Sequence, residues 1–270
     1  MLDRDGMTGE VSTADGIDYD HSRNRHSVKD PRAALGILFP GGLPASCVDV
    51  GCGTGTWLRA IAEGGVADYI GVDGVEIPPA DLLFKRDRFV RRDLRTKWDL
   101  GRRFEAAFCL EVAEHIEPEY AETLVDALAR HSDTVIFSAA CPGQPGQHHI
   151  NCQWPSYWQG LFNARGYVCD DEARWQLWDK EGVDPWYKQN MFIARHAPGE
   201  AGREPRLRPV IHPEMVPFIE WYAKKEAAEE LQSEISTGRK DLAWYLDNGA
   251  RAIAAKLHRK LPGSGNEKPE

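Results

Sequence analysis

Apolar and polar residues alternate along the chain between strand-like and helix-like patterns. Seven apolar runs have the length of strands, at 46–50, 68–74, 88–94, 104–112, 132–140, 167–171 and 190–196. Helical periods separate most of them, at 28–39, within 51–65, at 119–131 and at 155–166. Strands that alternate with helices predict a mostly parallel sheet covered on both faces. We therefore expect an α/β fold with a seven-stranded, doubly wound sheet.

The last two apolar runs have no clear crossover helix between them. We expect them to pair antiparallel, which gives the sheet one antiparallel edge strand. Residues 213–261 form a long polar helical stretch that is interrupted near Gly238. This pattern predicts a C-terminal helical extension, and its aromatic positions favour a homodimer contact.

Three segments follow from these patterns. Residues 1–27 are polar and acidic and are expected to be a flexible N-terminal segment. Residues 28–197 hold all the strands and form the α/β domain. Residues 198–270 are expected to be a linker followed by a helical arm.

Composition narrows the class of protein. The 270 residues carry a formal net charge of −9, which argues against broad nucleic-acid binding. No window approaches the roughly 18 apolar residues of a membrane span. The six cysteines form no CxxC pair and are expected to be reduced thiols of a cytoplasmic protein. One local exception, residues 85–103, holds nine Lys or Arg, either as a solvated face or as a patch for a phosphorylated substrate.

The strongest local signal is "VDVGCGTG" at 48–55, where a strand enters a glycine turn before a helix. Glycines there allow positive φ and let a ligand approach the backbone closely. Asp73 follows Gly55 by 18 residues, at the end of the second apolar run, where a carboxylate can bind both ribose hydroxyls. A dinucleotide fingerprint would need a glycine where Thr56 stands. The pattern therefore indicates a nucleoside ligand other than a dinucleotide.

These motifs together resemble the class I S-adenosylmethionine (SAM)-dependent methyltransferases, over roughly residues 30–196. "VDVGCGTG", "GVD", "RRDL" and "AFCLEVAEHI" match four of their segments in order. The resemblance implies that Asp93 faces the adenine amino group and that the backbone near Leu110 holds the methionine end. It implies SAM as cofactor, bound by Asp49, Gly51, Cys52, Gly53, Gly55, Asp73, Gly74, Asp93, Leu94, Leu110 and Glu111.

The stretch "GQHHINCQW" at 146–154 follows the fifth strand, at the sheet edge where ligands bind in open α/β folds. His148, His149, Asn151 and Trp154 are therefore expected beside the methyl donor. The segment resembles one in bacterial methyltransferases of unassigned substrate, whose single histidine falls on His149. Either histidine could equally be a solvated loop residue, and His149 is the stronger candidate for catalysis.

The segment "EVAEH" places two carboxylates and an imidazole in the same crevice. It resembles E-x-x-E-H in small-RNA 2′-O-methyltransferases and ubiquinone-pathway O-methyltransferases. The implied metal ligands, for an ion such as Mg²⁺, are Glu111, Glu114, His115 and His149. Without a metal, the catalytic candidates are His149, His115 and Glu114, and a merely structural E-H pair also stays open.

Aromatic residues crowd into positions 154–187. Trp154, Trp158 and Phe162 have helical spacing and indicate core packing. Trp175, Trp178 and Trp186 either pack or stack on a sugar or aromatic acceptor.

The resulting hypothesis is a SAM-dependent methyltransferase that acts by SN2 transfer on a hydroxyl of a small molecule. A sugar or glycosylated natural product is the first choice of acceptor. The alternatives are an RNA 2′-O-methyltransferase and a catalytically silent SAM-binding partner subunit.

Overall fold

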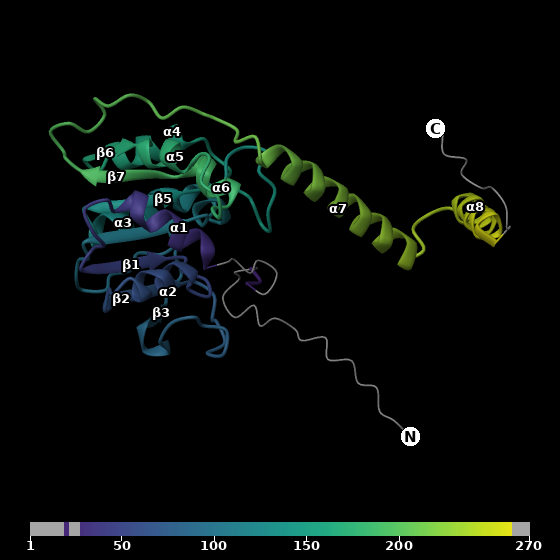
Figure 1. Ribbon diagram of the computed structural model, residues 1–270, viewed down its shortest axis with the longest axis horizontal. Helices are drawn as coiled ribbons and strands as arrows, with labels where there is room; N and C mark the ends of the chain where they lie inside the picture. The colour runs from purple at the N-terminus through teal and green to yellow at the C-terminus, as the bar shows by residue number, and fades with distance from the viewer. Residues whose placement is uncertain (1–18, 22–27, 261–270) are drawn as a thin grey trace, which may run out of the picture. The chain divides into compact units, whose positions relative to one another are not determined.

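The computed structural model describes residues 19–21 and 28–260. Two compact units divide the chain, residues 1–219 and residues 220–270. The first unit holds a seven-stranded sheet of order β3-β2-β1-β4-β5-β7-β6 (Figure 1). Its strands are β1 (Ser46–Val50), β2 (Asp68–Asp73), β3 (Phe89–Arg91), β4 (Ala106–Leu110), β5 (Thr134–Ser138), β6 (Tyr167–Asp170) and β7 (Phe192–His196). All seven predicted strands are confirmed.

Strand direction also agrees with the prediction. The strands from β3 to β5 pair parallel to one another. The strand that runs against the rest is β7, which pairs antiparallel with both β5 and β6. It lies one position in from the edge strand β6, so the chain after β6 returns across α5 and α6 to insert β7 between β5 and β6. The predicted antiparallel pairing at one edge is therefore confirmed.

Helices cover both faces of the sheet. They are α1 (Lys29–Leu38), α2 (Thr56–Glu63), α3 (Ala121–His131), α4 (Pro155–Asn163), α5 (Glu172–Leu177) and α6 (Pro185–Asn190). Side chains of β4 alternate between two apolar clusters, since successive strand residues point to opposite faces. Ala107 and Cys109 join the cluster under α3 and α4, whereas Phe108 joins the one under α1, α2, α5 and α6.

The region between β6 and β7 differs from the prediction. It contains α5 and α6, which each span six residues and were not expected. A helix this short presents fewer than two turns, so the hydrophobic period that reveals a helix is missing from the sequence. These two helices position several of the side chains described below.

Two helices follow the first unit's last strand along the chain. Helix α7 (Met215–Ser236) is followed by Gly238, with a φ of 68°, and then by α8 (Leu242–Lys260). The predicted C-terminal helices and the break near Gly238 are therefore confirmed. Across the described residues, no helix combines the length and the apolarity that crossing a membrane requires.

Candidate functional site

The main cavity lies where β1, β2 and β4 end. Strand order reverses beside β1, because the chain builds outward to β2 and β3 and then to β4 and β5 on the other side. Ligands of open α/β sheets bind outside the carboxyl ends of strands at such a point. All the predicted cofactor residues except Gly55 line this cavity: Asp49, Gly51, Cys52, Gly53, Asp73, Gly74, Asp93, Leu94, Leu110 and Glu111.

The glycine turn needs its glycines for two separate reasons. Gly51, Gly53 and Gly55 all have positive φ, of 76°, 50° and 88°. A Cβ on Gly51 would lie 2.3 Å from Cγ2 of Val112, and one on Gly55 would lie 2.1 Å from a ring carbon of Phe84. Gly55 therefore lies against Phe84 and does not line the cavity. Its role is to allow the turn of the backbone.

Asp73 ends β2 inside the cavity and is buried. Its Oδ2 accepts a hydrogen bond of 2.9 Å from the amide of Gly53, and its Oδ1 accepts one of 2.9 Å from the amide of Val75. Burial alone would raise the pKa of Asp73, but hydrogen bonds from His21 and these two amides lower it overall. The carboxylate is therefore held charged and oriented at the place predicted for ribose recognition.

Two other acids of the cavity have contrasting environments. Asp49 is 3% exposed, and burial, together with the charge of Asp73, raises its pKa to about 8. Asp93 is instead paired with the guanidinium of Arg95 at 2.8 Å, which lowers the pKa of Asp93. Asp49 is thus mainly protonated at neutral pH, whereas Asp93 is charged and already partnered.

A short row of aromatic rings links Asp73 to the histidines of the site. Nε2 of His21 lies 3.4 Å from Oδ1 of Asp73, and the ring of Tyr19 packs edge-on against His21. The same Tyr19 ring lies 4.7 Å from the ring of His115, which in turn lies 5.0 Å from His149. Tyr19 and His21 were missed by the sequence reasoning, because nothing in a polar N-terminal segment marks them as part of a cavity.

The two adjacent histidines have different positions. His148 has a φ of 54° and lines the cavity, whereas the side chain of His149 lies behind it, 12% exposed. Nδ1 of His149 lies 2.9 Å from the carbonyl oxygen of Gln144. The loop is also tied to the segment that follows β4, since the amides of Ile150 and Asn151 both donate to the carbonyl of Glu114. The stretch 146–154 is therefore an ordered wall of the site, with His148 rather than His149 at the surface of the cavity.

Glu114, His115 and His149 come together as predicted. Each offers one ligand atom, and these atoms lie within 4.8 Å of one another. Glu114 is fully buried and neither of its carboxyl oxygens has a hydrogen-bond partner, although amides of its own residue and of Ala140 lie near. Burial, and secondly the charge of Glu111, raises the pKa of Glu114, so a proton or a cation is required to balance this carboxyl group.

Both imidazoles of this cluster are oriented by backbone carbonyls. Nδ1 of His115 lies 3.3 Å from the carbonyl oxygen of His148, and Nδ1 of His149 lies 2.9 Å from that of Gln144. A nitrogen that faces a carbonyl carries the hydrogen, so Nε2 of each ring holds the lone pair. Burial lowers the pKa of both rings, that of His115 to about 3, and both are neutral. This arrangement is typical of imidazoles that bind a metal or accept a proton.

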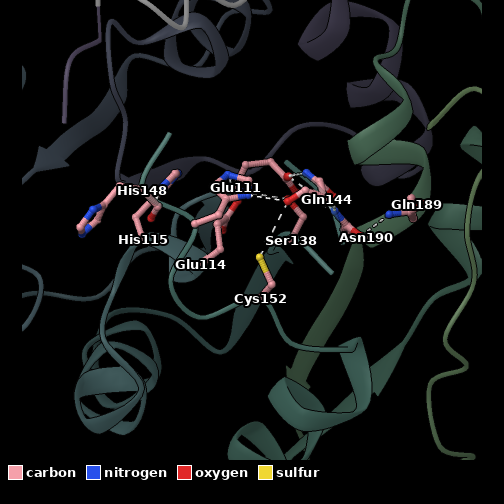
Figure 2. A network of polar contacts seen from close by, with 10 residues as sticks. Glu111, Glu114, His115, Ser138, Gln144, His148, Cys152, Gln189 and Asn190 are labelled. Atoms are coloured by element: carbon pink, nitrogen blue, oxygen red, sulfur yellow. Dashed lines mark hydrogen bonds and ion pairs between the residues drawn. The ribbon is translucent and has the colours of Figure 1, made fainter. Parts of the chain in front are cut away.

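Glu111 lies apart from this trio. Its φ is 55°, and its carboxylate accepts a hydrogen bond of 2.7 Å from the amide of Gln144 and one of 3.2 Å from Asn190. Figure 2 shows Glu111 between the histidines on one side and the amides on the other. Two imidazoles and one carboxylate are also a poor set for Mg²⁺, which prefers oxygen ligands.

The remaining sequence candidates lie elsewhere. Trp175, Trp178 and Trp186 do not line the cavity, whose aromatic walls among the described residues are Tyr19, Trp57 and Tyr187. In the basic stretch 85–103, four arginines pair with carboxylates: Arg86 with Glu76, Arg95 with Asp93, Arg102 with Asp68 and Arg103 with Asp133. Much of the positive charge of this stretch is therefore compensated locally.

The mostly parallel sheet, the glycine turn and the buried carboxylate of Asp73 together form the arrangement that the sequence predicted for a nucleoside-binding α/β domain. A family model described as "Methyltransferase domain" matches residues 19–181, which is more than half of the chain. The chain therefore belongs to this family, the class I SAM-dependent methyltransferases, and the predicted resemblance is confirmed. The match begins at Tyr19, which within the described ranges is the first residue of the cavity wall along the chain.

The chain is also similar to several solved structures. The chain resembles DesVI of Streptomyces venezuelae, with 17% identity and a TM-score of 0.48 over 70% of this chain and 100% of that one. It also resembles the sugar N-methyltransferase KedS8 of a Streptoalloteichus species, with 18% identity and a TM-score of 0.48 over 73% and 96%. Magnesium protoporphyrin IX methyltransferase of Synechocystis matches at 18% identity and 0.45, over 63% and 82%. Comparison with curated proteins gives no match.

Proposed function

We propose that this methyltransferase transfers the methyl group of SAM to a hydroxyl of a small-molecule acceptor, with a sugar or glycosylated natural product as first choice. The observation that carries the proposal is a buried cluster that reaches the cofactor cavity through one residue. The glycine turn and Asp73 suit an adenosyl group, and His115 lines the same cavity while its ring groups with Glu114 and His149. The cofactor supplies an electrophilic methyl group on a sulfonium.

The chain's own residues prepare the acceptor. A hydroxyl needs a base or a metal at neutral pH, because its own pKa is far above 7. We propose that His149, His115 and Glu114 supply this function, with the lone pair on each Nε2 available to the acceptor's proton. Proximity provides much of the remaining acceleration, because the residues hold the nucleophile in line at near-contact distance.

The same three residues could instead bind a divalent metal ion, and we propose this as the alternative function of the cluster. The unpartnered oxygens of Glu114 and the two carbonyl-oriented imidazoles supply one oxygen and two nitrogen ligands. Such a set favours a metal of the zinc or manganese type over magnesium, since imidazole binds it more readily. A bound ion would lower the pKa of an acceptor hydroxyl.

The rival acceptor is RNA, in keeping with E-x-x-E-H. The net charge of −9 and the paired arginines of residues 85–103 support a small molecule instead. A catalytically silent SAM-binding subunit is the other rival, against which the ordered histidine cluster argues.

The deciding experiment titrates SAM and S-adenosylhomocysteine (SAH) into chelator-treated protein by calorimetry. The same protein then receives labelled SAM with hexoses, aminohexoses and a short RNA, with and without Zn²⁺ or Mn²⁺. We expect micromolar SAH binding and label in a sugar. Label only in RNA would select the rival acceptor, and SAH binding with no transfer at all would select the silent subunit.

We also propose that the C-terminal helices form a homodimer contact. In the second unit, Trp221, Leu242, Leu246 and Ile253 are all more than half exposed. Apolar side chains repeated along one helix usually pack on a partner. A solution mass near twice 30.3 kDa is expected, and a mass equal to it would contradict the proposal.

A further inference from the structure

A chain of three buried side-chain amides ends on one carboxylate of the cavity. Gln144, Gln189 and Asn190 are 6%, 1% and 1% exposed. They come from the loop after β5 and from the end of α6. Gln144 and Asn190 both donate to Glu111, which follows β4, and Gln189 joins them through Asn190. None of the three was singled out as functional by the sequence reasoning, and the proposed transfer does not use them.

The direction of every hydrogen bond in this chain is fixed at its far end. The backbone amide of His212 can only donate, and it does so to Oε1 of Gln189 at 2.8 Å. Gln189 must then present its NH₂ group, which lies 3.3 Å from Oδ1 of Asn190. Asn190 in turn presents its NH₂ group to Oε1 of Gln144 at 2.8 Å and to Glu111.

The last link completes a one-way chain. Because Oε1 of Gln144 accepts from Asn190, its Nε2 must donate, and it lies 2.7 Å from Oε2 of Glu111. Both ends agree, since a backbone N–H begins the chain and a carboxylate ends it. Reversal of any one amide would place a carbonyl against an oxygen, so the network admits only one set of amide orientations.

The backbone also aims Glu111 toward these amides. A φ of 55° is costly for a residue with a Cβ, and the amide of Glu111 is held there by the carbonyl and the hydroxyl of Ser138, at 3.0 and 3.1 Å. Gln144 connects this carboxylate with the histidine cluster, because its carbonyl fixes His149 while its side chain fixes Glu111. One loop residue therefore sets the position of both groups.

Glu111 still has capacity for a ligand. A carboxylate has about four lone-pair positions, and the amides of Gln144 and Asn190 fill part of them. Within the described part of the chain, no Lys, Arg or His side chain lies within ion-pair distance of Glu111. A carboxylate that lines a cavity and is held only by neutral donors, the two amides and the hydroxyl of Ser138, is best completed by a donor from the ligand.

We propose that Glu111 is the acceptor-recognition carboxylate of this enzyme, and that Gln144, Gln189 and Asn190 are its positioning residues. It accepts a hydrogen bond from a hydroxyl or amino group next to the reacting atom, while the histidine cluster serves the reacting group itself. The substrate class is then an acceptor with two neighbouring donor groups, a vicinal diol or amino alcohol such as a sugar carries. This inference rests on the proposed methyl transfer.

The test compares Glu111→Gln and Asn190→Ala with Gln176→Ala, which removes an amide from the exposed face of α5. SAH affinity is measured by calorimetry, and KM and kcat are measured for the hexose or aminohexose that the wild type methylates best. We expect SAH affinity to stay within about threefold in all variants. The sugar KM should rise about tenfold or more for Glu111→Gln and less for Asn190→Ala, with smaller changes in kcat. Gln176→Ala should match the wild type.

A spectroscopic readout follows the amide chain without an acceptor. The infrared difference between wild type and Glu111→Gln isolates the carboxylate band of Glu111. Asn190→Ala should displace this band, and Gln144→Ala should do so as well if the Asn190 variant fails to fold. A band that neither variant moves would overturn the positioning role.

The outcomes separate the two proposals. A loss of SAH affinity of about tenfold or more in Glu111→Gln, with an unchanged sugar KM, would make Glu111 a cofactor ligand and overturn the inference. A wild type that binds SAH but methylates no hexose or aminohexose would overturn the assigned acceptor class. Failure of the wild type to bind SAH would instead overturn the proposed function, and the infrared result would still decide whether the amides orient Glu111.

Discussion

The two ends of the cavity are built in different ways. The cofactor end consists of a glycine turn and a carboxylate, Asp73, which two backbone amides hold in place. The proposed acceptor end consists of side chains from the end of β4, the loop after β5 and α6, joined by a chain of amides. Backbone geometry thus determines the first end of the cavity, whereas interlocked side chains determine the second.

The largest effect should come from the cofactor end. We expect Asp73→Ala to weaken SAH binding by about 100-fold or more, because a buried carboxylate that serves two ribose hydroxyls is lost. Calorimetry gives the affinity, and far-ultraviolet circular dichroism checks that the fold is intact. Unchanged SAH affinity would contradict the proposed role of Asp73 in ribose binding. It would also contradict the distinction drawn between the two ends of the cavity.

The acceptor end should respond in the opposite manner. We expect His149→Ala to reduce turnover by about 10- to 100-fold while SAH affinity changes little. His196→Ala is the matched control, because this imidazole lies half-exposed at the end of β7, paired with Asp133. Wild-type turnover in His149→Ala would return this histidine to the status of a structural loop residue.

The dependence of the glycine turn on its backbone conformation can be tested by adding one methyl group, in a glycine-to-alanine substitution. Gly51→Ala should lower the free energy of unfolding by about 2 kcal/mol, because φ is 76° and the new Cβ would meet Val112 at 2.3 Å. Gly65→Ala is the control, since its φ is 99° but nothing lies within 4 Å. Chemical denaturation measures both, and equal losses would show that φ alone is responsible.

The smallest expected effect is the release of a proton from Asp49 when SAH binds. Burial raises the pKa of Asp49 to about 8, so its carboxyl group is mainly protonated at pH 7. A bound amino-acid cation nearby would lower that pKa, so SAH binding should release a proton below about pH 8 and affinity should rise with pH up to that value. Calorimetry in buffers of different ionisation enthalpy measures the release, and Asp49→Asn should abolish it. Equal heats in all buffers would contradict this assignment.

Sequence reasoning reached the cofactor end because its signals are local. "VDVGCGTG" carries the turn in consecutive residues, and Asp73 stands at a fixed interval after it. The seven strands were also found, since alternation within each strand is a local pattern. The family match over residues 19–181 and the strand order agree with those expectations.

The acceptor end was only partly found, for a physical reason. Glu114, His115 and His149 were predicted to meet, because the topology brings the ends of β4 and β5 to one edge. The amides of Gln144, Gln189 and Asn190 depend on contacts between loops and a six-residue helix, and no period or motif announces such contacts. Tyr19 and His21 reach the cavity from a segment whose composition indicated only flexibility.

The short edge strands of the sheet limit self-association of the chain during folding. The outermost strands are β3 and β6, with three and four residues, and a short margin offers few free N–H and C=O groups to another chain. The longer antiparallel strand β7 is instead enclosed between β5 and β6. The order of the last three strands therefore protects the domain against edge-to-edge aggregation.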